Sequence, residues 1–321
     1  MSFGNNSNTL TYGNLTANGS FGNLSSNIFS SAPSILDFLI VGGGGGGGSS
    51  ASPQDGYASG SGGGGGGGVL RSFNTSSGDT TTPINASTAG VLTIVVGAGG
   101  ALATNGGNSS ITGSGVFRSV NGGNAGGSGN STGSASTVTG GSSGSPSIHS
   151  GSNGGSGAFS RSLCSGTPPN ATAGGQFSVI VGGHKGGGGG GAGGAGANGS
   201  GQSGGAGLSS SITGSALNYG GGGRAYSGSS GSTGTDGYGT GGRGSWSDNE
   251  IAMNAYVGNG NCQQLNMGVV QYNNPSAGDA GGVYLRWSGN VPSSNVGGTL
   301  STVGGDNLLS YTTAGTYTLI F

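Results

Sequence analysis

Residues 186–207 read GGGGGGAGGAGANGSGQSGGAG, and this stretch decides the fold because it supplies almost no side chains for a core. Two further glycine runs, residues 42–48 and 62–68, repeat the pattern, and the chain holds 86 glycines in 321 residues. A chain this rich in glycine and serine is ordinarily disordered, since glycine loses the most conformational entropy on folding. The runs are therefore either disordered or packed backbone against backbone.

Short apolar runs beside the glycine favour the ordered alternative. They are residues 35–41 (ILDFLIV), 90–96 (GVLTIVV), 177–181 (FSVIV) and 283–287 (VYLRW). Their composition is typical of β-strands, which a flexible linker does not need at its ends. Fixing each glycine costs roughly 1–2 kcal/mol, and only backbone hydrogen bonds, worth about 0.5–1.5 kcal/mol net, oppose that cost. The balance is close, so the apolar runs are needed as clamps.

The expected fold class is therefore mainly non-α, a glycine-rich bundle of polyglycine-II-like helices with three residues per turn, clamped by short β-strands. Small β segments are expected at both termini. Collagen is excluded because glycine does not recur strictly at every third position and the chain has only 8 prolines.

Three segments divide the chain. Residues 1–34 carry an aromatic residue followed by Gly-Asn at positions 3, 12 and 21, which predicts a β or attachment segment. Residues 35–290 form the glycine-rich domain with its loops, and residues 291–321 alternate in the manner of a terminal β-hairpin that pairs with the N-terminal strands. The only helix signal is the capping-box pattern at residues 247–250, which permits a two-turn helix reaching Tyr256.

The composition argues against several classes of function. Charged residues are 5% of the chain and the net charge is −1, so nucleic-acid binding is not expected. No apolar run approaches the roughly 20 residues that span a bilayer, so membrane insertion is not expected either. The N-terminal residues do not resemble a secretory signal, which favours a protein released by assembly or lysis. Cys164 and Cys262 either pair or stay free.

Catalysis and cofactor binding are not expected. Matches to the GxGxxG pattern arise by chance in so much glycine, and the run after Val41 lacks the helix and the acidic residue of a dinucleotide site. His149 and His184 stand alone, and no titratable pair has metal-ligand or acid/base spacing. The chain is interpreted as a non-enzyme without cofactor or metal.

Large side chains are dense in one long interval, residues 245–278. Aromatic residues on loops of a rigid scaffold are typical of recognition surfaces. The candidate receptor-binding residues here are Trp246, Met253, Tyr256 and Tyr272, with Phe73 and Phe159 as smaller candidates on other loops. The alternative is structural: the interval caps the glycine bundle or forms a subunit contact.

Residues 37–48, 93–100, 106–111 and 281–287 resemble the glycine-rich domain of bacteriophage tail-fibre and virion proteins. The resemblance covers residues 35–290. It is similar in style to phage tail-tip adhesins, which implies a bundle of polyglycine helices with variable receptor-binding loops at its distal end.

The resemblance implies a tail-fibre or spike adhesin on the virion that recognises a host surface glycan or outer-membrane protein. The two termini depart from tail-tip adhesins, so we expect them either to anchor the chain to other virion proteins or to mediate homotrimerisation. The alternative function is a self-assembling structural protein, such as a virion decoration or an extracellular filament subunit.

Overall fold

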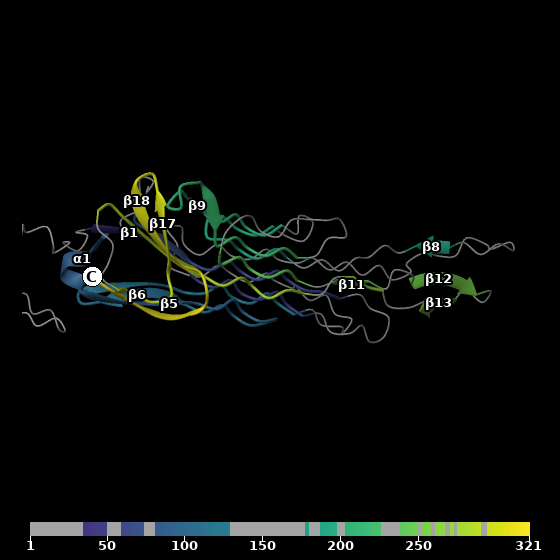
Figure 1. Cartoon of the computed structure of the whole chain (residues 1–321). Coiled ribbons are helices and arrows are strands. Elements are labelled where there is room, and N and C mark those ends of the chain that lie inside the picture. The colour runs from purple at the N-terminus through teal and green to yellow at the C-terminus, as the bar shows by residue number, and fades with distance from the viewer. Residues whose placement is uncertain are drawn as a thin grey trace, which may run out of the picture. The chain divides into compact units, whose positions relative to one another are not determined.

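A computed structural model describes the chain in two compact units, Met1–Ser31 and Ala32–Phe321. All of the residues whose structure is described here belong to the second unit (Figure 1). They are residues 35–49, 59–73, 81–128, 177–179, 187–197, 203–225, 238–244, 246–248, 252–257, 261–266, 270–272, 275–289 and 294–321.

A six-stranded antiparallel sheet forms around β1 (Ile35–Val41), which lies between β15 (Gly282–Trp287) and β3 (Val69–Arg71) and also pairs with β4 (Ile84–Asn85). β18 (Asp306–Tyr311) and β17 (Thr299–Val303) continue the sheet beyond β15. Nearly all of β1 is apolar and buried on both faces. That pattern is typical of a central strand with a packed layer on each side.

The second sheet has the order β16-β19-β5-β6-β7. Its core-facing residues alternate along each strand with residues that face outward, as in Leu92, Ile94 and Val96 of β5. These residues pack against Leu36, Phe38 and Ile40 of β1, so the two sheets form a sandwich with one continuous apolar core. The bounds of the strands are Ser294–Asn295, Gly315–Ile320, Val91–Val96, Ser109–Gly113 and Val116–Val120.

A third layer covers the other face of the six-stranded sheet. It is the hairpin of β9 (Leu208–Ser210) and β10 (Leu217–Tyr219), which buries Tyr219 against Tyr284 with ring centroids 5.7 Å apart. Arg71 also donates a hydrogen bond to the carbonyl of Ser209. The six-stranded sheet is therefore the middle of three layers.

The expected fold class is wrong. The chain is mostly antiparallel β-sheet, and the only helix in the described residues is α1 (Ala86–Ala89), so a polyglycine helix bundle is not the fold. The physical reason is that the strands, which we expected to be clamps, bury nearly all of the large apolar side chains. They form the core, and the glycine-rich segments connect them.

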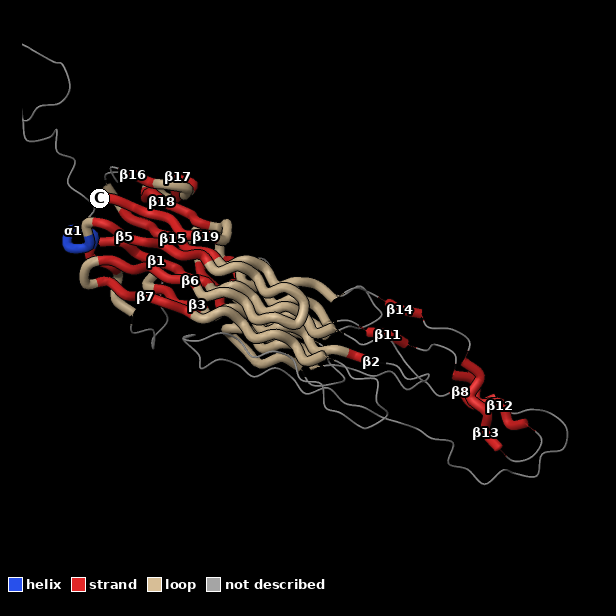
Figure 2. Tube along the Cα trace, turned by 90° about the horizontal axis from the view of Figure 1, so that it is seen from below, coloured by secondary structure: helices blue, strands red, loops and turns tan. Residues whose placement is uncertain are grey.

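We call these connecting segments the glycine lattice. They contain no helix and no strand, only an isolated β-bridge between Gly191 and Gly194, and Figure 2 shows them as loops that leave one end of the sheets side by side. The glycine lattice comprises residues 42–49, 61–68, 97–108, 121–128, 187–197, 203–207, 220–225, 238–244 and 275–281.

Most of the backbone hydrogen bonds in the lattice join different segments, although a few, such as Gly107 N–H to the Ala98 carbonyl, stay within one segment. The amides of Gly42, Gly45 and Gly48 donate to the carbonyls of residues 68, 65 and 62, at 2.8–2.9 Å. The amides of Gly43 and Gly46 donate to residues 107 and 104, and those of Gly44 and Gly47 donate to residues 279 and 276. Each successive amide therefore reaches a different neighbour, and the same neighbour returns at every third residue.

Side-chain amides complete this pattern at an edge of the lattice. The Oδ1 atoms of Asn105 and Asn108 accept hydrogen bonds from the amides of Ala125 and Gly122, at 2.8 and 3.1 Å. Both pairs of positions are three residues apart, which matches the three-residue return of the backbone bonds. The asparagines supply acceptors where a backbone carbonyl does not.

The expectation of order agrees with the described parts of residues 186–207. The carbonyls of Gly187 and Gly190 accept hydrogen bonds from Gly63 and Gly66, and the amide of Gly189 donates to Gly223. Residues 186 and 198–202 lie outside the described residues. The glycine stretch is thus ordered by backbone contacts, although not as a helix bundle.

The C-terminal segment contains a hairpin, but not the expected one. β17 and β18 pair through a turn at Gly304 and Gly305, which have φ of +60° and +92°. β18 and β19, the two strands expected to pair with each other, lie in different sheets because β19 pairs with β5. The expected pairing with residues 1–34 lies outside the described residues.

The helix permitted by the capping-box pattern does not form. β11 (Trp246–Asp248) and β12 (Ala252–Val257) occupy its place, and each pairs with two other strands. Tertiary pairing has overridden a weak local signal.

Candidate functional site

A small three-stranded sheet lies at the end of the glycine lattice away from the sandwich (Figure 2). Its strands are β2 (Ser59–Gly60), β11 and β14 (Val270–Tyr272). β2 leads into residues 61–68, which run to β3, and β14 leads into residues 275–281, which run to β15. The lattice therefore separates this sheet from the apolar core.

The sheet brings together two of the predicted site residues that are distant in sequence. Trp246 on β11 is the register partner of Tyr272 on β14 and of Gly60 on β2. Directly opposite positions in an antiparallel pair are the closest cross-strand neighbours. Trp246 and Tyr272 thus occupy adjacent positions at the far end of the lattice.

Met253 and Tyr256 lie on β12, in a second three-stranded sheet with β8 (Phe177–Val179) and β13 (Asn261–Asn266). The register places Met253 opposite Leu265 and Val179, and Tyr256 opposite Cys262. Phe159 and Cys164 lie outside the described residues. Four of the predicted residues are therefore on strands rather than in irregular loops.

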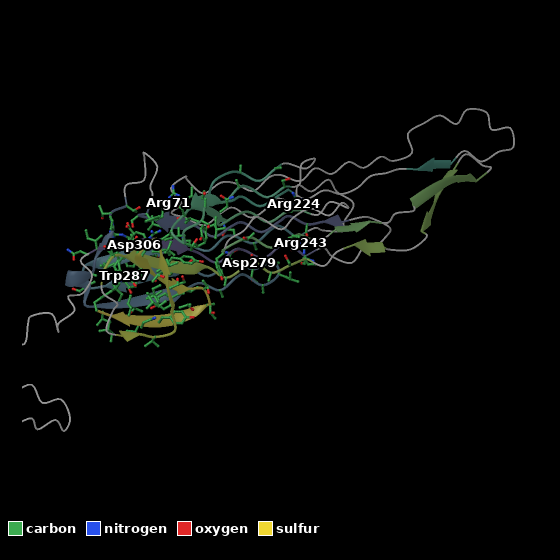
Figure 3. The ribbon with its side chains drawn as sticks, turned by 45° about the horizontal axis from the view of Figure 1, so that its top comes forward. Arg71, Arg224, Arg243, Asp279, Trp287 and Asp306 are labelled. Atoms are coloured by element: carbon green, nitrogen blue, oxygen red, sulfur yellow. The ribbon has the colours of Figure 1, made fainter. Side chains whose placement is uncertain are left out.

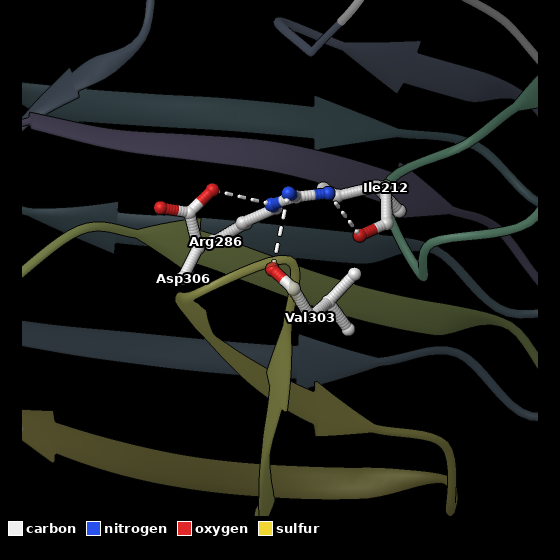
Figure 4. Close-up of polar contacts among 4 residues, drawn as sticks. All are labelled: Ile212, Arg286, Val303 and Asp306. Atoms are coloured by element: carbon white, nitrogen blue, oxygen red, sulfur yellow. Dashed lines mark hydrogen bonds and ion pairs between the residues drawn. The ribbon is translucent and has the colours of Figure 1, made fainter.

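Phe73 lies elsewhere. It follows β3, which residues 61–68 join at the sandwich end of the lattice. Its half-buried ring packs against the hairpin layer, with the guanidinium carbon of Arg286 4.6 Å from the ring centroid. Figure 4 shows Arg286 donating to Asp306 Oδ2 at 2.9 Å and to the carbonyls of Ile212 and Val303, at 3.3 and 3.2 Å. The structure does not bring Phe73 to Trp246 and Tyr272.

Two arginines that the sequence interpretation missed stand in the part of the lattice away from the sandwich. Arg224 and Arg243 are labelled there in Figure 3, while Arg71, Trp287 and Asp306 lie in the sandwich. The Gly244 amide donates to the Arg224 carbonyl at 2.9 Å, so the two arginines are on adjoining segments. Arg243 is exposed, and neither arginine forms an ion pair with a described residue. The signal in the sequence is an arginine placed directly after a glycine run.

The described residues contain no group of three His, Cys, Asp or Glu side chains arranged to hold a metal ion. In the same part of the chain, no helix has the length and apolar character needed to cross a membrane. The groups gathered at the lattice end are aromatic positions, backbone amides and two guanidinium groups. This set suits noncovalent binding of a polar partner.

The sequence comparisons give one family. The model described as a glycine-rich domain matches residues 16–288, which is most of the chain. No curated protein and no solved structure matches the chain. The match spans the sandwich strands up to β15 and all of the glycine lattice. The chain therefore belongs to the glycine-rich domain family.

Proposed function

We propose that this protein is a bacteriophage tail-fibre or spike adhesin, a virion structural protein that recognises a receptor on the host cell surface. The observation that carries the proposal is the small sheet of β2, β11 and β14, which holds Trp246 beside Tyr272 at the far end of the glycine lattice. Membership of the glycine-rich domain family supports it.

The lattice suits the role of a rigid spacer. Each successive amide of residues 42–48 and 62–68 donates a backbone hydrogen bond to another segment, and such bonds are worth about 0.5–1.5 kcal/mol each. Glycines in its interior have no room for a side chain, so the lattice itself has little chemistry with which to distinguish one receptor from another. Discrimination would fall to the side chains at its end.

The receptor in this proposal is a host surface glycan or an outer-membrane protein. Tryptophan and tyrosine are enriched among residues that dominate binding energy, and they combine an apolar face with a hydrogen-bonding group. Arg224 and Arg243 would add donors for carboxylate, phosphate or carbonyl groups of the receptor. Met253 and Tyr256 are the next candidates, on β12.

The test uses labelled full-length protein and a panel of bacterial strains that differ in surface glycans and outer-membrane proteins. Binding to a subset of strains is expected. Trp246→Ala and Tyr272→Ala should each weaken that binding by about 30-fold, equivalent to about 2 kcal/mol. Periodate and protease treatment of the cells separates a glycan receptor from a protein receptor.

Leu300→Ala is the matched control, because Leu300 is 42% exposed on β17, far from the lattice end. It should leave binding unchanged, and all three variants should melt as the parent protein does. Early melting of the Trp246 and Tyr272 variants would favour the structural alternative, in which residues 245–278 form a cap. Binding to no strain would contradict the proposal.

A self-assembling structural protein is the second candidate, and the exposed apolar side chains on the sandwich favour it. Ile35, Phe117 and Val296 are 57%, 72% and 57% exposed. Electron microscopy of the purified protein distinguishes the two candidates, because filaments would support self-assembly and discrete particles would support an adhesin.

A further inference from the structure

No layer formed by the described residues covers the outer face of the second sheet. The six-stranded sheet has the second sheet on one face and the β9–β10 hairpin on the other. The second sheet packs on the core with one face only, and its outward residues Val91, Phe117 and Ile320 are 49%, 72% and 39% exposed. This face lies on the side of the sandwich away from β9 (Figure 1).

The register aligns the outward residues in rows across the strands. One row runs from Thr318 through Thr93 and Thr112 to Phe117, on β19, β5, β6 and β7. The next runs from Thr316 through Val95 and Ser110 to Ser119, and Ile320 stands opposite Val91. We call these residues the threonine face, and they are Val91, Thr93, Val95, Ser110, Thr112, Phe117, Ser119, Thr316, Thr318 and Ile320.

None of these residues is charged. The nearest basic residue on these strands, Arg118, is the register partner of the core residue Ile111 and so lies on the inner side of β7. Its guanidinium donates to the Phe117 carbonyl at 3.1 Å and to the Thr82 hydroxyl at 3.5 Å. The core of a protein–protein interface is depleted in charged residues. This sheet face, made of β-branched and hydroxyl side chains, has the same lack of charge.

We infer that the threonine face is a self-association surface, on which a second copy of this chain packs its own threonine face. A charged partner would find no complementary charge there, whereas two identical faces meet without like-charge repulsion. Hydroxyl groups both donate and accept hydrogen bonds, so threonine rows on two copies satisfy each other. A pair of identical faces gives a closed twofold dimer, with the two sheets packed as in a sandwich.

The size of the face sets the expected strength. Four strands about 4.8 Å apart and six residues at about 3.4 Å give a footprint of roughly 400 Å². A standard stable interface buries about 800 Å² on each partner. We therefore expect a reversible dimer with a dissociation constant of about 1–100 μM. On a surface that presents many receptors, such pairing would give two binding ends and a gain in avidity.

Sedimentation velocity of the full chain from about 1 to 300 μM tests the inference. The parent protein should pass from monomer to dimer over that range. Thr93→Lys should raise the dissociation constant at least tenfold, because two like charges meet at the centre of the contact. Thr93→Glu should do the same, and a mixture of the two variants should recover association as a heterodimer.

Thr302→Lys is the matched control, since Thr302 is exposed on β17 outside the threonine face, and it should associate as the parent does. Phe117→Ser removes a largely exposed side chain and provides a second test if a charge at position 93 prevents folding. A parent protein that stays monomeric at about 300 μM would overturn the inference. So would unchanged association of the Thr93 variants, or failure of their mixture to recover it. Receptor binding by a monomer would leave the proposed function standing.

Discussion

The sandwich and the glycine lattice are both ordered, but for opposite reasons. In the sandwich, Phe38, Leu285 and Trp287 are at most 3% exposed, and order comes from the apolar surface that they remove from water. In the lattice, a Cβ atom on Gly44, Gly47 or Gly189 would lie under 3.0 Å from a neighbouring backbone. Order there depends on the absence of a side chain, because only bare backbones come close enough to exchange hydrogen bonds.

One chain can order both regions because the sandwich helps to order the lattice. The sandwich gathers large side chains from β1, β5, β15, β18 and β19 into one core. The lattice segments at residues 42–49, 97–108 and 275–281 start or end on those strands, so the sandwich fixes the position of one end of each. Segments that begin in fixed positions lose less freedom when they align, which lowers the entropic cost of ordering glycine.

The largest effect is expected from Gly189→Val. The added side chain would overlap the backbone of Gly64 and separate segments joined by hydrogen bonds such as Gly189 N–H to Gly223 at 2.8 Å. Several bonds of about 1 kcal/mol each would be lost, so we expect a loss of about 5 kcal/mol or more in the free energy of unfolding. Denaturant unfolding followed by circular dichroism measures it.

Gly194→Ala is the control from the same glycine stretch. A Cβ on Gly194 would lie 3.6 Å from the amide nitrogen of Ala206, an ordinary contact. We expect a change of less than about 1 kcal/mol. Equal losses from the two variants would contradict the claim that close backbone approach, rather than glycine content, orders the lattice.

Phe38→Ala applies the opposite change to the sandwich, by removing a side chain instead of adding one. Phe38 is fully buried between the sheets, so we expect a loss of about 3–5 kcal/mol in the free energy of unfolding. Phe117→Ala removes the same group from a 72% exposed site and should cost less than about 1 kcal/mol. Urea titrations of both proteins provide the comparison, and similar midpoints would argue against a sandwich core.

A smaller effect is expected from Asp306→Asn. The carboxylate accepts a hydrogen bond from Arg286 Nε at 2.9 Å, with the two side chains 33% and 13% exposed. Its removal leaves the guanidinium with two carbonyl partners, so we expect a loss of about 1–2 kcal/mol in stability. Thermal melts at low and high salt measure it, and a parent-like melting temperature would show that the carbonyls alone hold Arg286.

The last prediction concerns alkaline pH and acts on the sandwich alone. Burial raises the pKa of Tyr311 to about 12, and burial also raises the pKa values of Tyr284 and Tyr219. A raised tyrosine pKa contributes stability that is complete below pH 10 and is lost as the pH rises from 10 through 12.

Melting temperature against pH, followed by tyrosinate absorbance, checks this prediction. Tyr311→Phe should flatten part of the decline between pH 10 and 12, because phenylalanine cannot ionise. A decline of the same steepness in the variant would assign it to other groups.

Local composition was sufficient to predict several elements. The runs at residues 35–41, 91–96 and 283–287 are strands, as β propensity and apolar character indicate. The order of the described glycine runs also followed from the strands beside them. In addition, the family of the chain was visible in its glycine content and in the motifs that flank it.

Local sequence patterns gave wrong predictions where pairing with a distant strand decided the secondary structure of a segment. Residues 310–313 and 315–321 alternate like the two arms of one hairpin, yet β18 pairs with β15 and β19 pairs with β5, in different sheets. The capping box at residues 247–250 gave way to strand pairing. The fold class was wrong for the same reason, since the sequence does not reveal that distant strands share a core.

The sequence by itself determined that residues 35–41, 91–96 and 283–287 are strands, and that ordered glycine runs must touch through their backbones. The reason is local: glycine without Cβ and β-branched apolar runs have preferences of their own. Only the tertiary structure decided which strands pair, that Trp246 stands opposite Tyr272, and that the described residues leave the threonine face uncovered. Those outcomes depend on contacts between residues far apart in the chain, and the apolar area that such contacts bury outweighs any local preference.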